Sequence, residues 1–432
     1  MFIADSAMVG RLGTDHLAAI AVGGLIAEIL WVFSWTTAPG TQALAARRFG
    51  REQIAESPET KKRRERETGD ILAHAMIFSL FSGFTAVLVS FFANPVLNIL
   101  LDDGNVIGLA YDYIKIVRWA MPVIAVFYGI YGFIAGIGRT KTVMVASVMT
   151  NLLNVLFNYV LIYGKLGFPA MGMRGAAWGT LAAQSIGCIY FLATVLFDPV
   201  YKKYRRFSLK TINWVLIRDI GKSCIPITLQ NLSNQVFFLV YESFVAGYGT
   251  IYLGIMHVLF ILYWTGKMIS GGFAEGASIL VGNALGRKEK EEALRYSWSG
   301  VTIAVIIGAV IASVTFFFPE AVIRIFNSDP ALLEAGRSAL RFLAVFFFIE
   351  LFGYPFEIIF TRNGWGSFVL ISDFTTNGVF LFLVSYLLIN VVGVSISGAY
   401  LPFALYLVFH ASVLAIGFFS KKWMVRKIDS LS

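Results

Sequence analysis

Long apolar stretches recur along almost the whole chain and are separated by short polar connections. A helix needs about 20 apolar residues to cross a bilayer. Residues 1–10 look like the tail of one crossing helix, and eleven complete runs follow it, around 17–46, 71–101, 107–137, 142–163, 175–197, 224–247, 251–285, 297–326, 332–361, 367–390 and 396–420. The pattern predicts an all-α polytopic membrane protein.

Composition supports the same prediction. Of the 432 residues, 57% are hydrophobic and 14% are charged, whereas a soluble chain carries about 25% charged residues. This excludes an ordinary cytoplasmic enzyme, a disordered chain and a small disulfide-stapled domain. The two cysteines, Cys188 and Cys224, lie in or beside apolar runs and are interpreted as packing residues.

Basic residues are concentrated in alternate connections between the apolar runs. They lie mainly in 47–66, 139–141, 202–222, 287–295 and 421–427, with Arg362 between the last two. Basic loops remain in the cytoplasm, so these connections and the C-terminus are predicted to be cytoplasmic. The net charge of +9 is therefore a topology signal. Nucleic-acid binding is not expected, because the basic loops are short and lack interleaved aromatic residues.

The two halves of the chain resemble each other. Residues 38–50 match 274–286 at an offset of 236, and residues 143–151 match 369–377 at an offset of 226. Six spans per half make a parallel repeat about an axis along the membrane normal. We expect an N-terminal lobe at 1–199 and a C-terminal lobe at 223–424, with a basic linker at 200–222 and a tail at 425–432. When the two halves are aligned at the offset of 236, the residues that would begin the first helix fall before Met1. This indicates a truncated chain or a misassigned start.

Four segments in order resemble the MATE family of multidrug and toxin extrusion transporters. They are DSAMVGRLG (5–13), GIGRTKTVMVASVMTNLLN (136–154), GMRGAAWGT (172–180) and GASILVGNALG (276–286). The resemblance implies a twelve-helix fold of two six-helix lobes in a bacterial inner membrane, here with a shortened first helix. It also implies export of cationic or amphiphilic compounds by alternating access, driven by protons or sodium ions, with no other cofactor. Membrane lipids are expected partners, and the protein is expected to be a monomer.

The N-terminal lobe carries a candidate site for the coupling ion. Asn151, Asn154 and Asn158 recur at helical spacing, and amide oxygens on one face are able to ligate a hard cation. Hydrogen bonding between helices is the alternative. By resemblance, Asp5 is the first-helix acid used in coupling, and Thr180 completes the site. Sodium is expected at Asp5, Asn154 and Asn158, although a related branch of the family has an aspartate where Asn158 stands.

The C-terminal lobe carries candidate residues for a substrate or a second cation. Glu242 is next to Tyr241, the repeat counterpart of Asp5, and Glu350 lies near the middle of its apolar run. A charge at that depth costs at least about 2.5–3.5 kcal/mol, so it invites a functional interpretation. Lys267 is a further candidate, because a buried lysine deprotonates readily and is able to act as a coupling group. In the alternative, purely structural reading, Lys267 and Arg118 are the candidate ion-pair partners of these acids.

Further polar residues of this half are candidates for a pocket or a gate because of their positions in the chain. Three amides after Pro226 are able to line a pocket with Tyr241 or simply to pack: Gln230, Asn231 and Asn234. Glu357 and Asp373 are expected near Arg362, as gate or interface groups.

Enzyme functions find no support in the sequence. It has no HExxH pattern and no Walker A sequence, so neither that metalloprotease chemistry nor ATP hydrolysis is indicated. One alternative is a lipid-linked oligosaccharide flippase, which resembles these exporters in architecture but favours a basic cavity for phosphate. Here the central acids match or outnumber Lys267 and Arg118, which favours cationic cargo. A non-transporting receptor or scaffold is a third class, and the repeat and the intramembrane charges argue against it.

Overall fold

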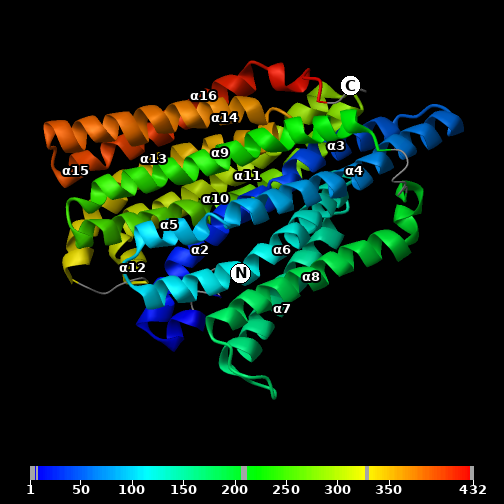
Figure 1. Cartoon of the computed structure of the whole chain (residues 1–432). Coiled ribbons are helices and arrows are strands. Elements are labelled where there is room, and N and C mark those ends of the chain that lie inside the picture. The colour runs from blue at the N-terminus through cyan, green and yellow to red at the C-terminus, as the bar shows by residue number, and fades with distance from the viewer. Residues whose placement is uncertain (1–4, 6–7, 206–211, 326–329, 429–432) are drawn as a thin grey trace. The chain divides into compact units, whose positions relative to one another are not determined.

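A computed structural model describes residue 5 and residues 8–205, 212–325 and 330–428. These residues are helical almost throughout and contain no strand (Figure 1). The chain divides into two compact units, Met1–Thr228 and Leu229–Ile428. The predicted tail of a first helix, residues 1–10, lies largely outside the described residues, although Asp5 and residues 8 and 9 are helical.

The first unit is organised around one long helix, α6 (Gly104–Gly136), which contacts α2, α3, α4 and α8. The other elements of the unit are η1 (Gly10–Leu12), α2 (Thr14–Trp35), α3 (Thr37–Gln53), α4 (Pro58–Ser90), α5 (Ala93–Leu100), α7 (Thr140–Tyr163), α8 (Met173–Phe197) and η2 (Pro199–Tyr204). Helix α9 (Trp214–Ala246) begins in this unit, and the boundary between the units falls inside it.

Local sequence explains where these helices begin and how closely they pack. At the start of α4, the Ser57 side chain accepts a hydrogen bond from the Thr60 backbone N–H. Asp103 caps the start of α6 in the same way. Gly83 allows α4 to approach α6, because a Cβ there would lie 2.5 Å from the Cα of Pro122. Such small residues bring membrane helices into close contact.

The second unit has a corresponding central helix, α13 (Pro330–Thr361), which contacts α10, α11 and α16. Its other elements are α10 (Thr250–Gly286), α11 (Lys290–Phe317), α12 (Pro319–Arg324), α14 (Gly366–Thr376), α15 (Ile396–Ala399), α16 (Leu401–Phe419) and η6 (Lys422–Met424). Two π-helical stretches, η4 (Asn377–Val384) and η5 (Tyr386–Val392), continue α14.

The helix boundaries confirm the internal repeat. Helix α6 begins at Gly104 and α13 at Pro330, while α7 begins at Thr140 and α14 at Gly366, both at the predicted offset of 226. Helix α2 begins at Thr14 and α10 at Thr250, at the offset of 236. Equivalent helices therefore occupy equivalent places in the order of each unit.

The predicted apolar runs all coincide with helices. Nine helical segments in the described part of the chain are long and apolar enough to cross a bilayer. The two remaining predicted spans correspond to α9 and α10. Large apolar side chains face outward, such as Leu152 at 66% exposure and Ile189 at 62%, as expected for helices that contact lipid.

Candidate functional site

A buried cluster in the first unit surrounds the carboxylate of Asp5. This side chain is only 2% exposed. Asn158 of α7 donates its amide to Asp5 Oδ1, and the Thr180 hydroxyl of α8 donates to Asp5 Oδ2 at 3.3 Å. Asn154 Nδ2 in turn donates to Thr180 Oγ1 at 3.1 Å. We refer to Asp5, Asn154, Asn158 and Thr180 as the Asp5 cluster.

Two oxygen atoms of the Asp5 cluster are buried without a hydrogen-bond partner among the described residues: Oδ1 of Asn154 and Oδ1 of Asn158. A buried amide oxygen without a partner costs about 1–3 kcal/mol. Together with the carboxylate of Asp5 and the hydroxyl of Thr180, they form an oxygen-only donor set. Hard cations prefer such oxygen ligands, so the residues present fit a sodium ion.

Glycine residues of α8 make room for this cluster. A Cβ at Gly179 would lie 2.3 Å from Asn158 Oδ1, and one at Gly175 would lie 2.6 Å from the backbone of Leu161. The two glycines are one turn apart and bring α7 and α8 together. This contact positions Asn158 and Thr180 on the same carboxylate.

The structure does not bring Asn151 to the Asp5 cluster. This side chain is exposed and donates to the backbone oxygen of Ser147 at 2.8 Å. Its spacing from Asn154 and Asn158 suggested one shared face. However, the buried face of α7 carries only the later two asparagines.

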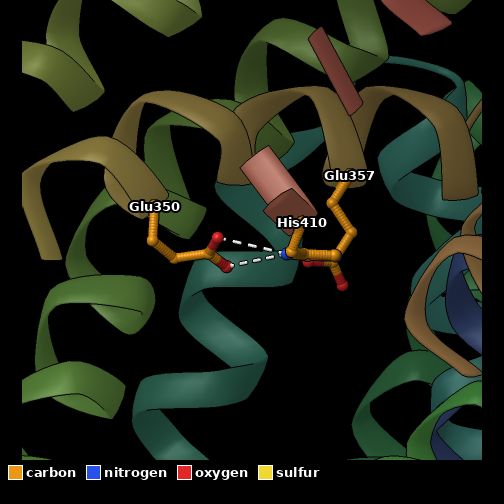
Figure 2. A group of neighbouring side chains, drawn as sticks. All are labelled: Glu350, Glu357 and His410. Carbon is orange, nitrogen blue, oxygen red and sulfur yellow. Dashed lines mark hydrogen bonds and ion pairs between the residues drawn. The ribbon is translucent and has the colours of Figure 1, made fainter. Parts of the chain in front are cut away.

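A second cluster, in the second unit, is centred on His410 of α16. The ring nitrogen Nδ1 lies 3.1 Å from Glu350 Oε2, and Nε2 lies 2.6 Å from Asp373 Oδ1. Figure 2 shows His410 between Glu350 and Glu357, which both project from α13. Gly353 makes this arrangement possible, because a Cβ there would lie 2.7 Å from the Cα of Ala411. Helix α16 therefore approaches α13 closely beside His410.

Lys267 of α10 supplies the ammonium group of this cluster. Its Nζ lies 3.3 Å from Glu350 Oε1 and 3.4 Å from Glu357 Oε2. It also lies 4.2 Å from the ring centre of Tyr354 and 3.2 Å from the hydroxyl of Tyr263. Contact with an aromatic face stabilises a desolvated ammonium group.

Amide side chains hold the remaining carboxylate oxygens. Gln230 Nε2 donates at 2.8 Å both to Glu357 Oε1 and to Asp373 Oδ2. Asn234 Nδ2 donates to the same Asp373 oxygen at 2.9 Å, and Asn377 Nδ2 donates to Asn234 Oδ1 at 2.7 Å.

The second cluster contains more carboxylates than ammonium groups. It holds three carboxylates, those of Glu350, Glu357 and Asp373, against the ammonium of Lys267 and the imidazole of His410. Glu350 and His410 are fully buried, while the Glu357 side chain is 12% exposed. We refer to these five residues as the His410 cluster.

Comparison with known proteins decides the family. The MatE family model matches residues 1–160 and 226–387. This chain belongs to the MatE family. Its members are transporters and not enzymes.

Curated relatives of this MatE protein are named as multidrug resistance proteins. A probable multidrug resistance protein NorM of Thermotoga maritima is 22% identical, over 99% of this chain and 89% of its own length. A probable multidrug resistance protein NorM of Neisseria meningitidis serogroup B is 26% identical, over 79% of this chain and 72% of its own length. The multidrug resistance protein PmpM of Pseudomonas aeruginosa is 26% identical, over 81% and 72%.

Solved structures share the fold. A crystal structure of MATE in the bent conformation superposes with a TM-score of 0.85 at 22% identity, covering 98% of this chain and 91% of that chain. An outward-facing conformation of a multidrug resistance MATE family transporter gives 0.84 at 21% identity, covering 98% and 92%. The predicted twelve-helix architecture is confirmed at the level of the fold.

Several predicted residues of the MatE protein are not among the contacts of the His410 cluster given above. Tyr241 is fully buried and donates its hydroxyl to the Ala399 backbone at 2.9 Å. Glu242 and Asn231 are half-buried, and the contacts of the cluster given above involve neither. Arg118 lies in the first unit, where its guanidinium stacks on Phe91 at 4.8 Å. Lys267 is thus the partner of Glu350.

The sequence interpretation misplaced or missed three members of the His410 cluster. Glu357 and Asp373 were expected beside Arg362. The structure pairs Arg362 with Glu275 at 3.0 Å and joins Glu357 and Asp373 through Gln230. His410 lies in an apolar run, and no motif marks it in the sequence. The repeat offered one signal. At the offset of 226, His410 corresponds to Gln184, another buried polar residue in an apolar helix.

Proposed function

We propose that this MatE protein is a secondary active antiporter. It exports cationic or amphiphilic compounds in exchange for sodium ions or protons, and it works by alternating access. The names of its curated relatives support multidrug efflux. The observation that carries the proposal is the Asp5 cluster, because it places one carboxylate and unpartnered amide oxygens in a buried site.

The coupling step follows from the cost of a buried charge. Among the described residues, hydrogen bonds from Asn158 and Thr180 compensate the carboxylate of Asp5 when no cation is bound. Asp5, Asn154, Asn158 and Thr180 would hold sodium, and the bound ion would supply the positive charge. A proton on Asp5 removes the same charge. Either ion drives transport only if the two conformations bind it differently, so the site is expected to be accessible in one and dehydrated in the other.

The His410 cluster supports a cationic cargo. It presents three carboxylates, one of them partly exposed, together with the rings of Tyr263 and Tyr354. An organic cation gains from carboxylates and from aromatic faces. The alternative of a lipid-linked oligosaccharide flippase requires a basic cavity for phosphate, and the excess of acids in this cluster favours cations instead.

The proposal includes a bacterial inner-membrane location, with the basic connections and the C-terminus in the cytoplasm. The alternation of basic and non-basic connections supports this orientation. A cysteine introduced beside Lys61 is expected to react with an impermeant maleimide only after the membrane is opened, whereas one at Gly167 should react in intact cells. The opposite pattern overturns the orientation.

The transport proposal is tested by reconstituting the purified chain in liposomes and following ethidium movement under a sodium gradient and, separately, a proton gradient. Movement that follows one gradient is expected, and this result identifies the coupling ion. If a correctly inserted protein moves no ethidium or other cationic dye under either gradient, the multidrug proposal fails.

A further inference from the structure

The His410 cluster contains a set of groups suited to a small metal ion. Glu350, Glu357 and His410 each offer one ligand atom, and these atoms all lie within 4.8 Å of one another. The two glutamates come from one helix, seven residues apart, and the imidazole enters from a second helix between them (Figure 2). Two carboxylates and one imidazole are the donor types that bind zinc and other first-row transition metals.

Asp373 orients the imidazole for this purpose. Its Oδ1 lies 2.6 Å from His410 Nε2, so this nitrogen donates its proton to the carboxylate. The other nitrogen, Nδ1, then faces Glu350, whose Oε2 lies 3.1 Å away. Histidines that bind metals almost always donate their second ring nitrogen to a carboxylate or a carbonyl in this way. Gln230 and Asn234 hold Asp373 in turn, so the orientation of the ring is fixed by a second layer of contacts.

Gln230 adds an independent observation. Its side chain is 1% exposed, and its Oε1 has no hydrogen-bond partner among the described residues. The nitrogen of the same amide donates to Glu357 and Asp373, so the oxygen of this amide lies close to the cluster. A bound cation would satisfy this buried acceptor, which otherwise costs about 1–3 kcal/mol.

Lys267 occupies the place that a metal ion would take. Its ammonium lies 3.3 Å and 3.4 Å from oxygens of the same two glutamates. The side chain is long and flexible, and the ring of Tyr354, 4.2 Å away, offers the ammonium another favourable surface. Lys267 is thus a built-in cation with which an incoming ion competes.

We propose that Glu350, Glu357 and His410 form a binding site for a divalent transition-metal ion, with Asp373 orienting the imidazole and Lys267 as the internal competitor. The imidazole ligand selects Zn²⁺ over Mg²⁺ and Ca²⁺, which prefer oxygen donors. The site does not depend on the proposed export of organic cations. Metal binding is measurable on the purified chain even if no dye is transported.

The test is a titration of the purified, untagged, detergent-solubilised chain with Zn²⁺ against a chromogenic chelator. One Zn²⁺ per chain is expected, and Mg²⁺ should not compete. His410→Gln and Glu350→Gln should each weaken binding by at least about tenfold, as loss of a ligand or its support does in metal sites. Lys267→Met should strengthen it by a similar factor. Glu334→Gln, at an exposed acid of α13 outside the cluster, is the matched control and should change nothing.

Folding is checked separately by the melting temperature and elution volume of each variant. X-ray absorption of the zinc-loaded chain should show nitrogen and oxygen neighbours, including one imidazole. The proposal is overturned if neither the wild type nor Lys267→Met binds Zn²⁺ stoichiometrically. It is also overturned if folded His410→Gln binds as tightly as the wild type, because the zinc then occupies another site.

Discussion

Asn158 and Gly179 face each other between α7 and α8, and a side chain on the glycine would lie 2.3 Å from Asn158 Oδ1. The asparagine amide therefore reaches Asp5 only because position 179 lacks a Cβ. This contact allows the geometry of the Asp5 cluster to be perturbed without removing any of its polar groups.

The first prediction follows from that contact. Gly179→Ala should displace the Asn158 amide, and overpacking of this kind costs about 1–3 kcal/mol. We expect the affinity for the coupling ion, measured as the half-saturating ion concentration for ethidium movement, to fall about tenfold or more. Gly108→Ala on α6 is the control, because a Cβ there meets no atom within 4 Å. Equal ion dependence in the two variants would contradict the assigned geometry.

Asn154 and Asn151 provide a matched pair on one helix. Asn154 is fully buried and donates to Thr180, whereas Asn151 is exposed and bonds to its own helix backbone. Asn154→Ala should weaken ion-coupled transport, since it removes a donor and an unpartnered oxygen from the Asp5 cluster. Asn151→Ala should leave transport close to wild type. A larger transport defect in Asn151→Ala than in Asn154→Ala would contradict this assignment and support the three-asparagine site expected from spacing alone.

Glu350 should be important for stability as well as for binding. Its carboxylate accepts from Lys267, Tyr263 and His410 inside the second unit. Removing one partner of a buried ion pair costs about 3–5 kcal/mol, so Glu350→Gln should lower the melting temperature markedly. Glu320→Gln breaks a solvent-exposed pair with Arg337 and should cost less than about 1 kcal/mol. Thermal unfolding in detergent measures both, and comparable losses would argue against a tightly coupled cluster.

Tyr204 links η2 to the end of α3. Its hydroxyl donates to both oxygens of Glu52, at 3.1 Å and 3.0 Å, and Lys203 pairs with the same carboxylate. Burial, followed by the negative charge of Glu52, raises the pKa of the Tyr204 hydroxyl well above its usual range, so it remains a donor. Tyr204→Phe should cost about 1.5–3 kcal/mol, the range for a hydrogen bond to a charged group. Tyr159→Phe, at a half-exposed position, should leave the melting temperature unchanged. An unchanged melting temperature in Tyr204→Phe would argue against this link.

Much of the architecture was predictable because membrane helices must be long and apolar. The eleven runs became helices, and the offsets of 226 and 236 reappear in their boundaries. Helical spacing predicts Asn154 and Asn158, and the family resemblance adds Asp5 and Thr180. The structure places these four residues in contact.

The composition of the His410 cluster was less predictable. It gathers residues from α10, α13, α14 and α16, and no local spacing relates Lys267 to His410. Tyr241 was chosen because it is the repeat counterpart of Asp5, but its side chain packs and donates to the Ala399 backbone instead. The repeat preserves helix positions more closely than it preserves chemistry, because Tyr241 stands at the position that corresponds to Asp5.

The central claim is that inward ion movement through the Asp5 cluster is exchanged for an organic cation. The most direct measurement loads liposomes that contain the chain with ethidium and follows uptake of radioactive sodium, and in parallel internal acidification. We predict that an outward ethidium gradient drives uptake of one of these ions in the wild type, and that Asp5→Asn abolishes it. The exposed acid variant Asp15→Asn should retain uptake. Equal ethidium-driven ion uptake by Asp5→Asn and the wild type would contradict the account.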